Sequence, residues 1–409
     1  MALLASERTR LQGFEPVAFA GASIGALATV LGVFLEHRPN RVQSGLSVSA
    51  LEAFGDAGWI LLGVWIALAL LLALPTAFPH SGRATALAAA LLAASIVPVS
   101  LLLASQSAGS HIAAAGDLAR TSLGVSFWLY VFAVYLVLRS SVLHITQRWL
   151  RAGISLLAPS AVIALAAAGA LGSLSIMIEY TRFERAFWEN FQQHVAYTLG
   201  TTGVALLAGV ALGVWAAKRA RAEAAIFGVL NVAQVMPALA FVGLIMPSMG
   251  WLAENSALAR AIGVSGIGWA PVFLVLVMYA LYPITRNTYA AIRALDKGVT
   301  DAARGMGMDS RRRLLSIELP LAAPVVMAGI RIALVQTAAG AILAALVGGG
   351  GLGRIVFYGL EQTAEDLVVL GIIAIVGLGL TLDVTLRFLI AILDRTGGSL
   401  ALQKNGLKS

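Results

Sequence analysis

The sequence has no cysteine and few charged residues, which occupy only 12% of its 409 positions. The absence of cysteine excludes disulfide bonds, thiolate metal sites and cysteine nucleophiles. Because about a quarter of the residues in a soluble domain are charged, the shortage of charge argues against a water-soluble globular protein. The chain is instead 59% hydrophobic, and its 42 glycines suit helices that pack closely within a bilayer.

Residue patterns for catalysis and metal binding are absent as well. The five histidines are scattered without the spacing of metal ligands, so no metal site is expected. Neither a Ser/His/Asp arrangement nor paired intramembrane carboxylates indicate hydrolysis, and no catalytic residue is predicted. None of the four lysines follows a glycine-rich stretch as a phosphate-binding loop requires, so the chain cannot be its own ATPase. We expect neither an enzyme nor a cofactor bound by this chain.

Long apolar runs dominate the sequence. About 20 mainly apolar residues are needed to cross the hydrocarbon core of a bilayer. Ten runs qualify: 17–35, 57–79, 84–105, 121–138, 153–178, 195–217, 225–249, 262–283, 321–346 and 367–393. The first run follows two arginines, as in a signal peptide, but its length and the lack of a nearby cleavage site favour a retained span. The sequence thus predicts an all-α polytopic membrane protein with about ten transmembrane helices.

Basic residues are distributed unequally between the two sides of this arrangement. If the N-terminus is cytoplasmic, 20 of the 28 Lys and Arg residues lie in inside segments, seven lie outside, and Arg331 lies within a span. Since cytoplasmic loops are enriched in basic residues, both termini are predicted to be cytoplasmic. The formal charge of +8 therefore reflects mostly topology, and nucleic acid is not an expected partner.

The second half of the chain begins with a change of composition. Residues 179–194 mix charges with Phe183, Phe187 and Phe191, which recur every four residues and form one apolar stripe on a helix. We interpret this segment as an interfacial helix on the outer surface, with a solvated turn as the alternative. Prolines at positions 237, 247, 271, 283, 320 and 324 indicate broken or closely packed helices that form a pathway.

The basic loop after the eighth run predicts a helical hairpin. Thr300 or Asp301 can cap a short helix, which Gly305 or Gly307 can end. A second helix over 311–319 follows a cap at Asp309 or Ser310 and ends at Pro320. Its apolar patch consists of Leu314, Leu315, Ile317 and Leu319. An apolar patch on a cytoplasmic hairpin indicates docking into a groove on a partner.

The same loop carries a family motif. Asp301-Ala302-Ala303 is followed by Gly307 after three residues, by Ile317 after nine more and by Leu319-Pro320 after one more. This arrangement resembles the Glu-Ala-Ala, Gly, Ile, Leu-Pro signature of ATP-binding cassette importer permeases, and Asp301 in place of Glu is the single departure. The resemblance implies that these residues form coupling helices. Such helices dock into a cleft of a separate ATPase subunit, which would bind ATP and Mg²⁺.

The resemblance extends over about residues 188–393 and is greatest to permeases for glycine betaine, choline, carnitine and related osmoprotectants. It implies a five-helix type I importer core at 195–393 with the coupling loop at 284–320, after an interfacial connecting helix at 179–194. Residues 1–178 resemble the N-terminal region, here of about five helices, of long-form osmoprotectant permeases, and 394–409 would be a cytoplasmic tail. The implied partners are the ATPase, a periplasmic substrate-binding protein, a second permease copy or related permease, and lipid of the bacterial inner membrane.

Candidate residues for a substrate pathway lie in the second half. Aromatic faces attract a quaternary ammonium group, and polar side chains can line a transient path. The candidates are Asn231, Gln234, Pro237, Tyr279, Tyr282 and the intramembrane Arg331. Packing or interface anchoring is the alternative for each aromatic or amide residue, and a structural ion pair or snorkelling is the alternative for Arg331. Asp383 and Arg387 have the spacing of a helical ion pair.

A glycine run is the candidate outer gate. Gly348, Gly349, Gly350, Gly351 and Gly353 lack the Lys and Ser/Thr of a nucleotide loop, so we interpret them as a hinge or re-entrant turn. The resulting hypothesis is a non-catalytic permease subunit of an importer. Two alternatives stay open: a secondary transporter driven by an ion gradient, which would usually place acidic residues at midmembrane, and a membrane assembly or regulatory protein that no longer transports.

Overall fold

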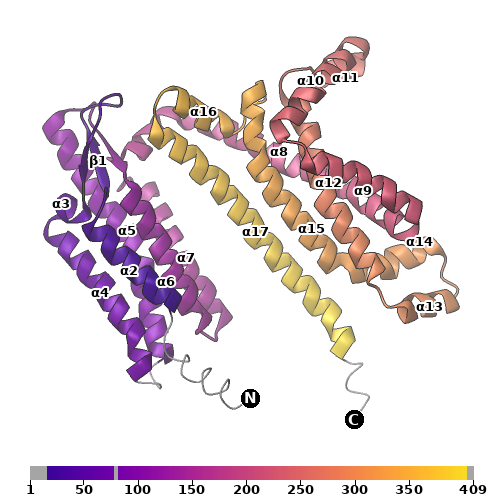
Figure 1. Ribbon diagram of the computed structural model, residues 1–409, viewed down its shortest axis with the longest axis horizontal. Helices are drawn as coiled ribbons and strands as arrows, with labels where there is room; N and C mark the ends of the chain where they lie inside the picture. Colours follow the sequence, from indigo (N-terminus) through magenta and orange to yellow (C-terminus); the bar gives the residue numbers. More distant parts are fainter. Residues whose placement is uncertain (1–15, 78–81, 403–409) are drawn as a thin grey trace. The chain divides into compact units, whose positions relative to one another are not determined.

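The chain forms two compact units, Met1–Arg182 and Phe183–Ser409. The computed structural model describes residues 16–77 and 82–402 (Figure 1). Most of the described residues are helical, as the sequence predicts for a polytopic membrane protein. The predicted cytoplasmic location of the chain ends concerns residues 1–15 and 403–409, which lie outside the described part.

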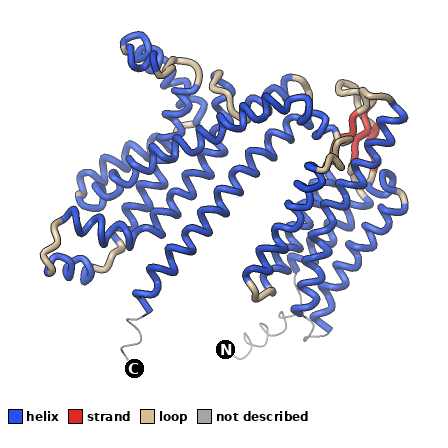
Figure 2. The backbone as a smooth tube through the Cα atoms, turned by 180° about the vertical axis from the view of Figure 1, so that it is seen from behind, coloured by secondary structure: helices blue, strands red, loops and turns tan. Residues whose placement is uncertain are grey.

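The first unit is a helical bundle with a small sheet at one end (Figure 2). Its helices are α2 (Pro16–Val30), α3 (Ala50–Phe54), α4 (Asp56–Ala77), α5 (Gly82–Ala115), α6 (Val125–Leu143) and α7 (Arg148–Ala167). Strands β1 (Leu35–Arg38), β2 (Leu46–Val48) and β3 (Arg120–Leu123) form an antiparallel sheet in the order β2-β1-β3.

This small sheet is an addition to the mainly helical fold that the sequence predicts. Leu35 pairs with Val48 on one side and with Leu123 on the other. The sequence predicts continuous spans over the apolar runs 17–35 and 121–138, but the end of the first run and the start of the second are strands, at Leu35 and at residues 121–123. Period-2 pairing of short polar segments between helices is too brief a signal to separate from a loop.

The core of the first unit is built around aromatic side chains. Trp65 and Tyr130 are fully buried, and their ring centroids lie 5.2 Å apart in an edge-to-face arrangement. Tyr130 also shares a hydrogen bond with the hydroxyl of Thr29 on α2. A Cβ at Gly25 would lie 2.3 Å from the Trp65 ring. Glycine at this position therefore allows α2 to approach the indole of α4.

The second unit contains the remaining helices. They are α8 (Ser175–Lys218, which begins in the first unit), α9 (Ala220–Val235), α10 (Ala238–Asn255), α11 (Ala257–Ala261), α12 (Trp269–Arg293), α13 (Lys297–Gly305), α14 (Ser310–Arg313), α15 (Leu319–Gly340), α16 (Gly353–Glu361) and α17 (Glu365–Leu402). A π-helical turn, Leu314–Glu318, joins α14 to α15, and a 3₁₀ segment, Ala341–Val347, follows α15. Helix α15 packs against both α12 and α17, around a core that includes the fully buried Ile284 and Ala333.

Within the described residues, each predicted apolar run lies mostly on a helix or a helix pair, although several bounds differ and two runs include residues of the sheet. In the described part, seven helices are long and apolar enough to span a membrane, or eight if one bent pair is a single span. That pair is α9 and α10, which meet at 111° where the seventh run was expected to continue. Met236 is extended there, as expected for a residue before proline, and Pro237 precedes the first turn of α10. The eighth span starts at Trp269 rather than 262, because Gly263 and Gly268 have positive φ.

Segment 179–194 is part of a longer helix than expected. Helix α8 continues without a break from Ser175 to Lys218, so no boundary separates this segment from the sixth span. The alternative of a solvated turn is wrong. Phe187 is 8% exposed, whereas the adjacent Trp188 is 47% exposed, which is consistent with one buried and one open face.

Candidate functional site

The hairpin that carries the motif, residues 297–320, begins one turn earlier than its sequence suggested. The side chain of Asp296 caps α13 by accepting a hydrogen bond from the Gly298 amide at 2.8 Å. The predicted cap at Thr300 or Asp301 is therefore wrong. Asp301 lies within the helix and forms an ion pair with Arg304 at 3.0 Å. Gly307 follows the helix with φ of +77°, in the left-handed region that favours glycine.

The second part of the hairpin is continuous with the ninth span. Asp309 caps α14 through the Arg312 amide at 3.0 Å, which confirms one of the two predicted caps. The prediction that Pro320 ends this helix is wrong, because the π-turn leads directly into α15. Pro320 lies in the first turn of α15, where a missing N–H is tolerated.

The motif residues are divided between the core and the surface of the hairpin. Ala303 is fully buried, whereas Asp301, Ala302, Gly307 and Pro320 are exposed. Ile317 and Leu319 are half-buried. The exposed apolar surface of the hairpin consists mainly of Met306, 68% exposed, and Leu315, 54% exposed. The motif thus contributes one buried residue, Ala303, and an exposed surface with both charged and apolar side chains.

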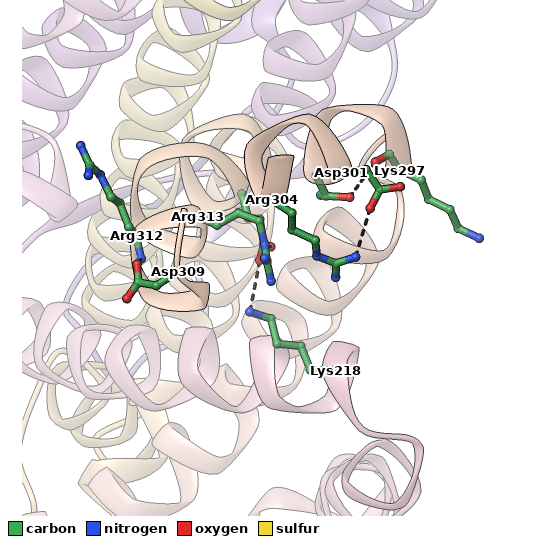
Figure 3. A network of polar contacts seen from close by, with 9 residues as sticks. Lys218, Lys297, Asp301, Arg304, Asp309, Arg312 and Arg313 are labelled. Atoms are coloured by element: carbon green, nitrogen blue, oxygen red, sulfur yellow. Dashed lines mark hydrogen bonds and ion pairs between the residues drawn. The ribbon is translucent and has the colours of Figure 1, made fainter. Parts of the chain in front are cut away.

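An ion-pair network that the sequence reasoning missed lies behind this surface (Figure 3). Glu318 is 5% exposed and accepts a hydrogen bond from Nε of Arg313 at 2.8 Å. Its other carboxylate oxygen lies 3.2 Å from Nζ of Lys218, the last residue of α8. The network therefore connects the end of α8 to the π-turn of the hairpin. The one available signal was a lone carboxylate in the otherwise apolar and basic stretch 311–320.

Three predicted pathway residues meet at the break between α9 and α10. The hydroxyl of Tyr279 donates a hydrogen bond to the Met236 carbonyl, next to Pro237. Nε2 of Gln234 donates to the Tyr279 carbonyl at 2.8 Å. Gln336 of α15, which the sequence reasoning missed, approaches Oε1 of Gln234 at 3.5 Å. The first contact satisfies the Met236 carbonyl at the break, and the second satisfies the Tyr279 carbonyl inside α12, whose usual donor four residues on would be Pro283, which has no N–H.

The other pathway candidates lie elsewhere. Asn231 is exposed on α9, and Tyr282 packs against the core between α12 and its neighbours. Arg331 forms an ion pair with Asp383 of α17, and Asp383 also pairs with Arg387 at 2.7 Å. The predicted Asp383–Arg387 pair is therefore present, and it includes Arg331 as a third member.

The glycine run folds back onto α8. Gly348, Gly350 and Gly351 have φ between +76° and +79°. The Tyr197 hydroxyl donates to the Gly349 carbonyl at 2.6 Å, and Oε1 of Gln193 accepts from the Gly351 amide at 3.0 Å. These hydrogen bonds fix the run in one conformation against α8.

A cavity of about 520 Å³ opens beside this run. Three aromatic residues contribute to its lining, Tyr197, Trp269 and Phe273, together with Gln193, Gly268 and Gly349. The Trp269 and Phe273 ring centroids lie 5.7 Å apart in an edge-to-face arrangement. No described charged side chain lines the cavity. The sequence reasoning identified the glycines but not the aromatic residues, which come from two other helices.

The long apolar helices, the bent α9–α10 pair and the Arg331–Asp383 ion pair within apolar helices are features of a polytopic membrane transport protein. Residues 209–396 match the family described as binding-protein-dependent transport system inner membrane component. Residues 12–177 match the N-terminal domain of the ABC transporter permease YehY. The chain belongs to the family of binding-protein-dependent transport system inner membrane components, which confirms the resemblance seen in the sequence.

Curated relatives are similar over about half of the chain. The choline transport system permease protein OpuBB of Bacillus subtilis is 31% identical over 47% of this chain and 82% of the relative. The carnitine transport permease protein OpuCB of Listeria monocytogenes is 32% identical over the same shares. The osmoprotectant import permease protein OsmW of Salmonella typhimurium is 31% identical over 50% of this chain and 90% of the relative.

Proposed function

We propose that this permease subunit imports small methylated ammonium compounds of the glycine betaine, choline and carnitine class across the bacterial inner membrane. The printed names of the relatives support the substrate class. The observation that carries the proposal to this chain is the aromatic cavity beside the glycine run. A methylated ammonium group cannot donate a hydrogen bond but is attracted to aromatic faces, with greatest effect where water is excluded.

The composition of the cavity fits such a ligand. Because no described lining residue is charged, attraction for a cation falls to Tyr197, Trp269 and Phe273. The amide of Gln193 supplies a polar contact for a hydroxyl or carboxylate group on the same ligand. The glycine run would act as the outer gate, since its hydrogen bonds to Gln193 and Tyr197 connect its position to the cavity wall.

Energy for import would come from a separate ATPase that docks on the hairpin of α13 and α14. A periplasmic binding protein would deliver the substrate, and a second permease copy or related permease would complete the pore. The excess of basic residues on one side of the predicted topology supports a cytoplasmic location of both termini. The N-terminal region, residues 1–178, would be an addition to the transport core at residues 195–393. An ion-gradient mechanism is disfavoured because Asp383, which lies toward one end of the last predicted span, already pairs with two arginines.

The test is uptake of radiolabelled choline, glycine betaine and carnitine into proteoliposomes that contain the permease, its co-purified ATPase and binding protein. We expect uptake that requires ATP on the side of the membrane to which the ATPase is bound. This uptake should persist when ionophores dissipate ion gradients. Uptake abolished by ionophores but independent of ATP would contradict the importer mechanism. No uptake of any substrate, with ATPase activity intact, would favour the non-transporting alternative.

A further inference from the structure

A second cavity, of about 570 Å³, lies at the end of the second unit that carries the coupling hairpin. The ends of α8 and α12 and the hairpin form its walls. Five of its lining residues are basic and only one is acidic: Lys218, Arg293, Lys297, Arg304 and Arg313 against Glu318. Enrichment in basic residues is expected of cytoplasmic loops in general. That general enrichment does not by itself place basic residues from four separate segments around one cavity, as is the case here.

Carboxylates within the described part neutralise only some of this charge. Glu318 pairs with both Lys218 and Arg313, and Asp301, which is not a lining residue, pairs with Arg304. Arg293 and Lys297 form no ion pair with any described carboxylate. An excess of positive charge in a partly enclosed space lowers the free energy of a bound anion, since nearby charges are screened less there than on open surface.

The arrangement of the basic groups suits a phosphate group. In Figure 3 the side chains of Lys218, Arg304 and Arg313 extend toward a common region, whereas the amine of Lys297 points away from it. Guanidinium groups donate paired hydrogen bonds that match phosphate oxygens, and the lysine ammonium adds a point charge. The cavity therefore offers two guanidinium groups and one ammonium group around one space, and Arg293 of α12 supplies a further guanidinium in the lining.

We propose that this cavity binds a phosphate group, carried either by the headgroup of an anionic phospholipid or by a soluble phosphate compound. The bound phosphate competes with Glu318 for Lys218 and Arg313, the two residues that connect the end of α8 to the hairpin. Occupancy thus changes the strength of that connection. The site is independent of the substrate class assigned above, because it lies on the hairpin side of the second unit and shares no lining residue with the aromatic cavity.

The test uses the purified full chain in a neutral detergent and isothermal titration calorimetry. The probes are inorganic phosphate and short-chain phosphatidylglycerol, and short-chain phosphatidylcholine is the uncharged-headgroup control. The variants Arg293→Gln and Arg304→Gln each remove one lining guanidinium. Arg311→Gln removes the same charge from an exposed position of the same hairpin outside the lining.

We expect saturable binding of at least one anionic probe, weakened about tenfold by Arg293→Gln or Arg304→Gln, and unchanged by Arg311→Gln. Arg304→Lys, which retains charge, should restore part of the affinity. Binding of phosphatidylglycerol alone would identify a lipid headgroup, and binding of phosphate alone would identify a soluble ligand. Absence of binding of both probes to the native chain, or equal loss in Arg311→Gln, would overturn the proposal. Circular dichroism and gel filtration of each variant separate loss of binding from misfolding.

Discussion

Nζ of Lys218 lies 3.2 Å from the carboxylate of Glu318, so the last residue of α8 contacts the π-helical turn that follows α14. Arg313 holds the other carboxylate oxygen at 2.8 Å. The two contacts join segments about one hundred residues apart in the sequence through one buried acidic side chain. A displacement of the hairpin must therefore move α8 or break this ion pair.

Replacement of Glu318 should destabilise the fold. Glu318→Gln removes the negative charge and leaves Arg313, whose side chain is 11% exposed, without its partner. We expect a loss of about 1–3 kcal/mol, at the lower end of the range for a broken buried pair because Lys218 is partly exposed. Thermal unfolding of the detergent-solubilised chain measures the loss. Glu361→Gln, at an exposed position of α16, is the control and should have no effect.

Gly307 should be sensitive to substitution because its backbone has a positive φ. Its φ of +77° disfavours any residue with a Cβ, although a Cβ there would meet no described atom within 4 Å. Gly307→Val should therefore cost about 1–2 kcal/mol and should distort the hairpin. Gly305→Ala, in open space and at the end of α13, should be tolerated.

The measurement for Gly307 is ATP-dependent uptake beside ATPase activity in the reconstituted complex. We expect Gly307→Val to insert normally, to bind the ATPase less tightly and to transport less per ATP hydrolysed. Normal transport and normal ATPase stimulation in Gly307→Val would show that the hairpin is only a connector.

The sequence was a good guide where one residue type determines local structure. Asp309 was among the expected caps, and each of the ten apolar runs lies mostly on helices within the described residues. The cap of α13 was assigned too late because Asp296, Thr300 and Asp301 all have side chains that can cap, and local sequence does not choose among them. The break at Pro237 was indicated only as a tolerated proline, since its angle depends on contacts with Tyr279 of another helix.

Contacts between residues far apart in the sequence were the part of the structure that the sequence predicted least well. Glu318 is one carboxylate in a basic loop, and its partner Lys218 belongs to a different span. The aromatic cavity combines Tyr197 of α8 with Trp269 and Phe273 of α12. Neither arrangement has a period or a spacing along the chain, so neither could be recognised without tertiary structure.

His37 in the sheet of the first unit should make that unit sensitive to mild acid. Burial lowers the pKa of His37, and the nearby His111, whose ring centroid lies 4.6 Å away, lowers it further. Because the folded state then binds the proton less readily than the unfolded state, stability is full above the unfolded pKa of about 6.5 and decreases as pH falls below it. Thermal unfolding at pH 7.5 and pH 5.5 should show a decrease that His37→Gln reduces. His144→Gln, on another part of the unit, should retain the full decrease; equal decreases in all three proteins would contradict this role for His37.

Trp269 should contribute directly to substrate affinity at the aromatic cavity. Trp269→Leu keeps an apolar side chain but removes the indole face, and the loss of a partly desolvated cation–π contact of about 1–2 kcal/mol would raise KM for choline about 5- to 30-fold. Trp251→Leu is the matched control, since Trp251 is 65% exposed on α10 and does not line the cavity. The assay is concentration-dependent uptake into proteoliposomes, with the ATPase activity of each variant measured in parallel.

Because Nε1 of Trp269 also donates to the Gly263 carbonyl at 2.9 Å, Trp269→Phe is needed as a second variant. It removes the same hydrogen bond but keeps an aromatic face, so its KM should lie much nearer the native value. An equal increase in KM for Trp269→Leu and Trp269→Phe would assign the effect to the lost hydrogen bond and would contradict cation binding in the cavity.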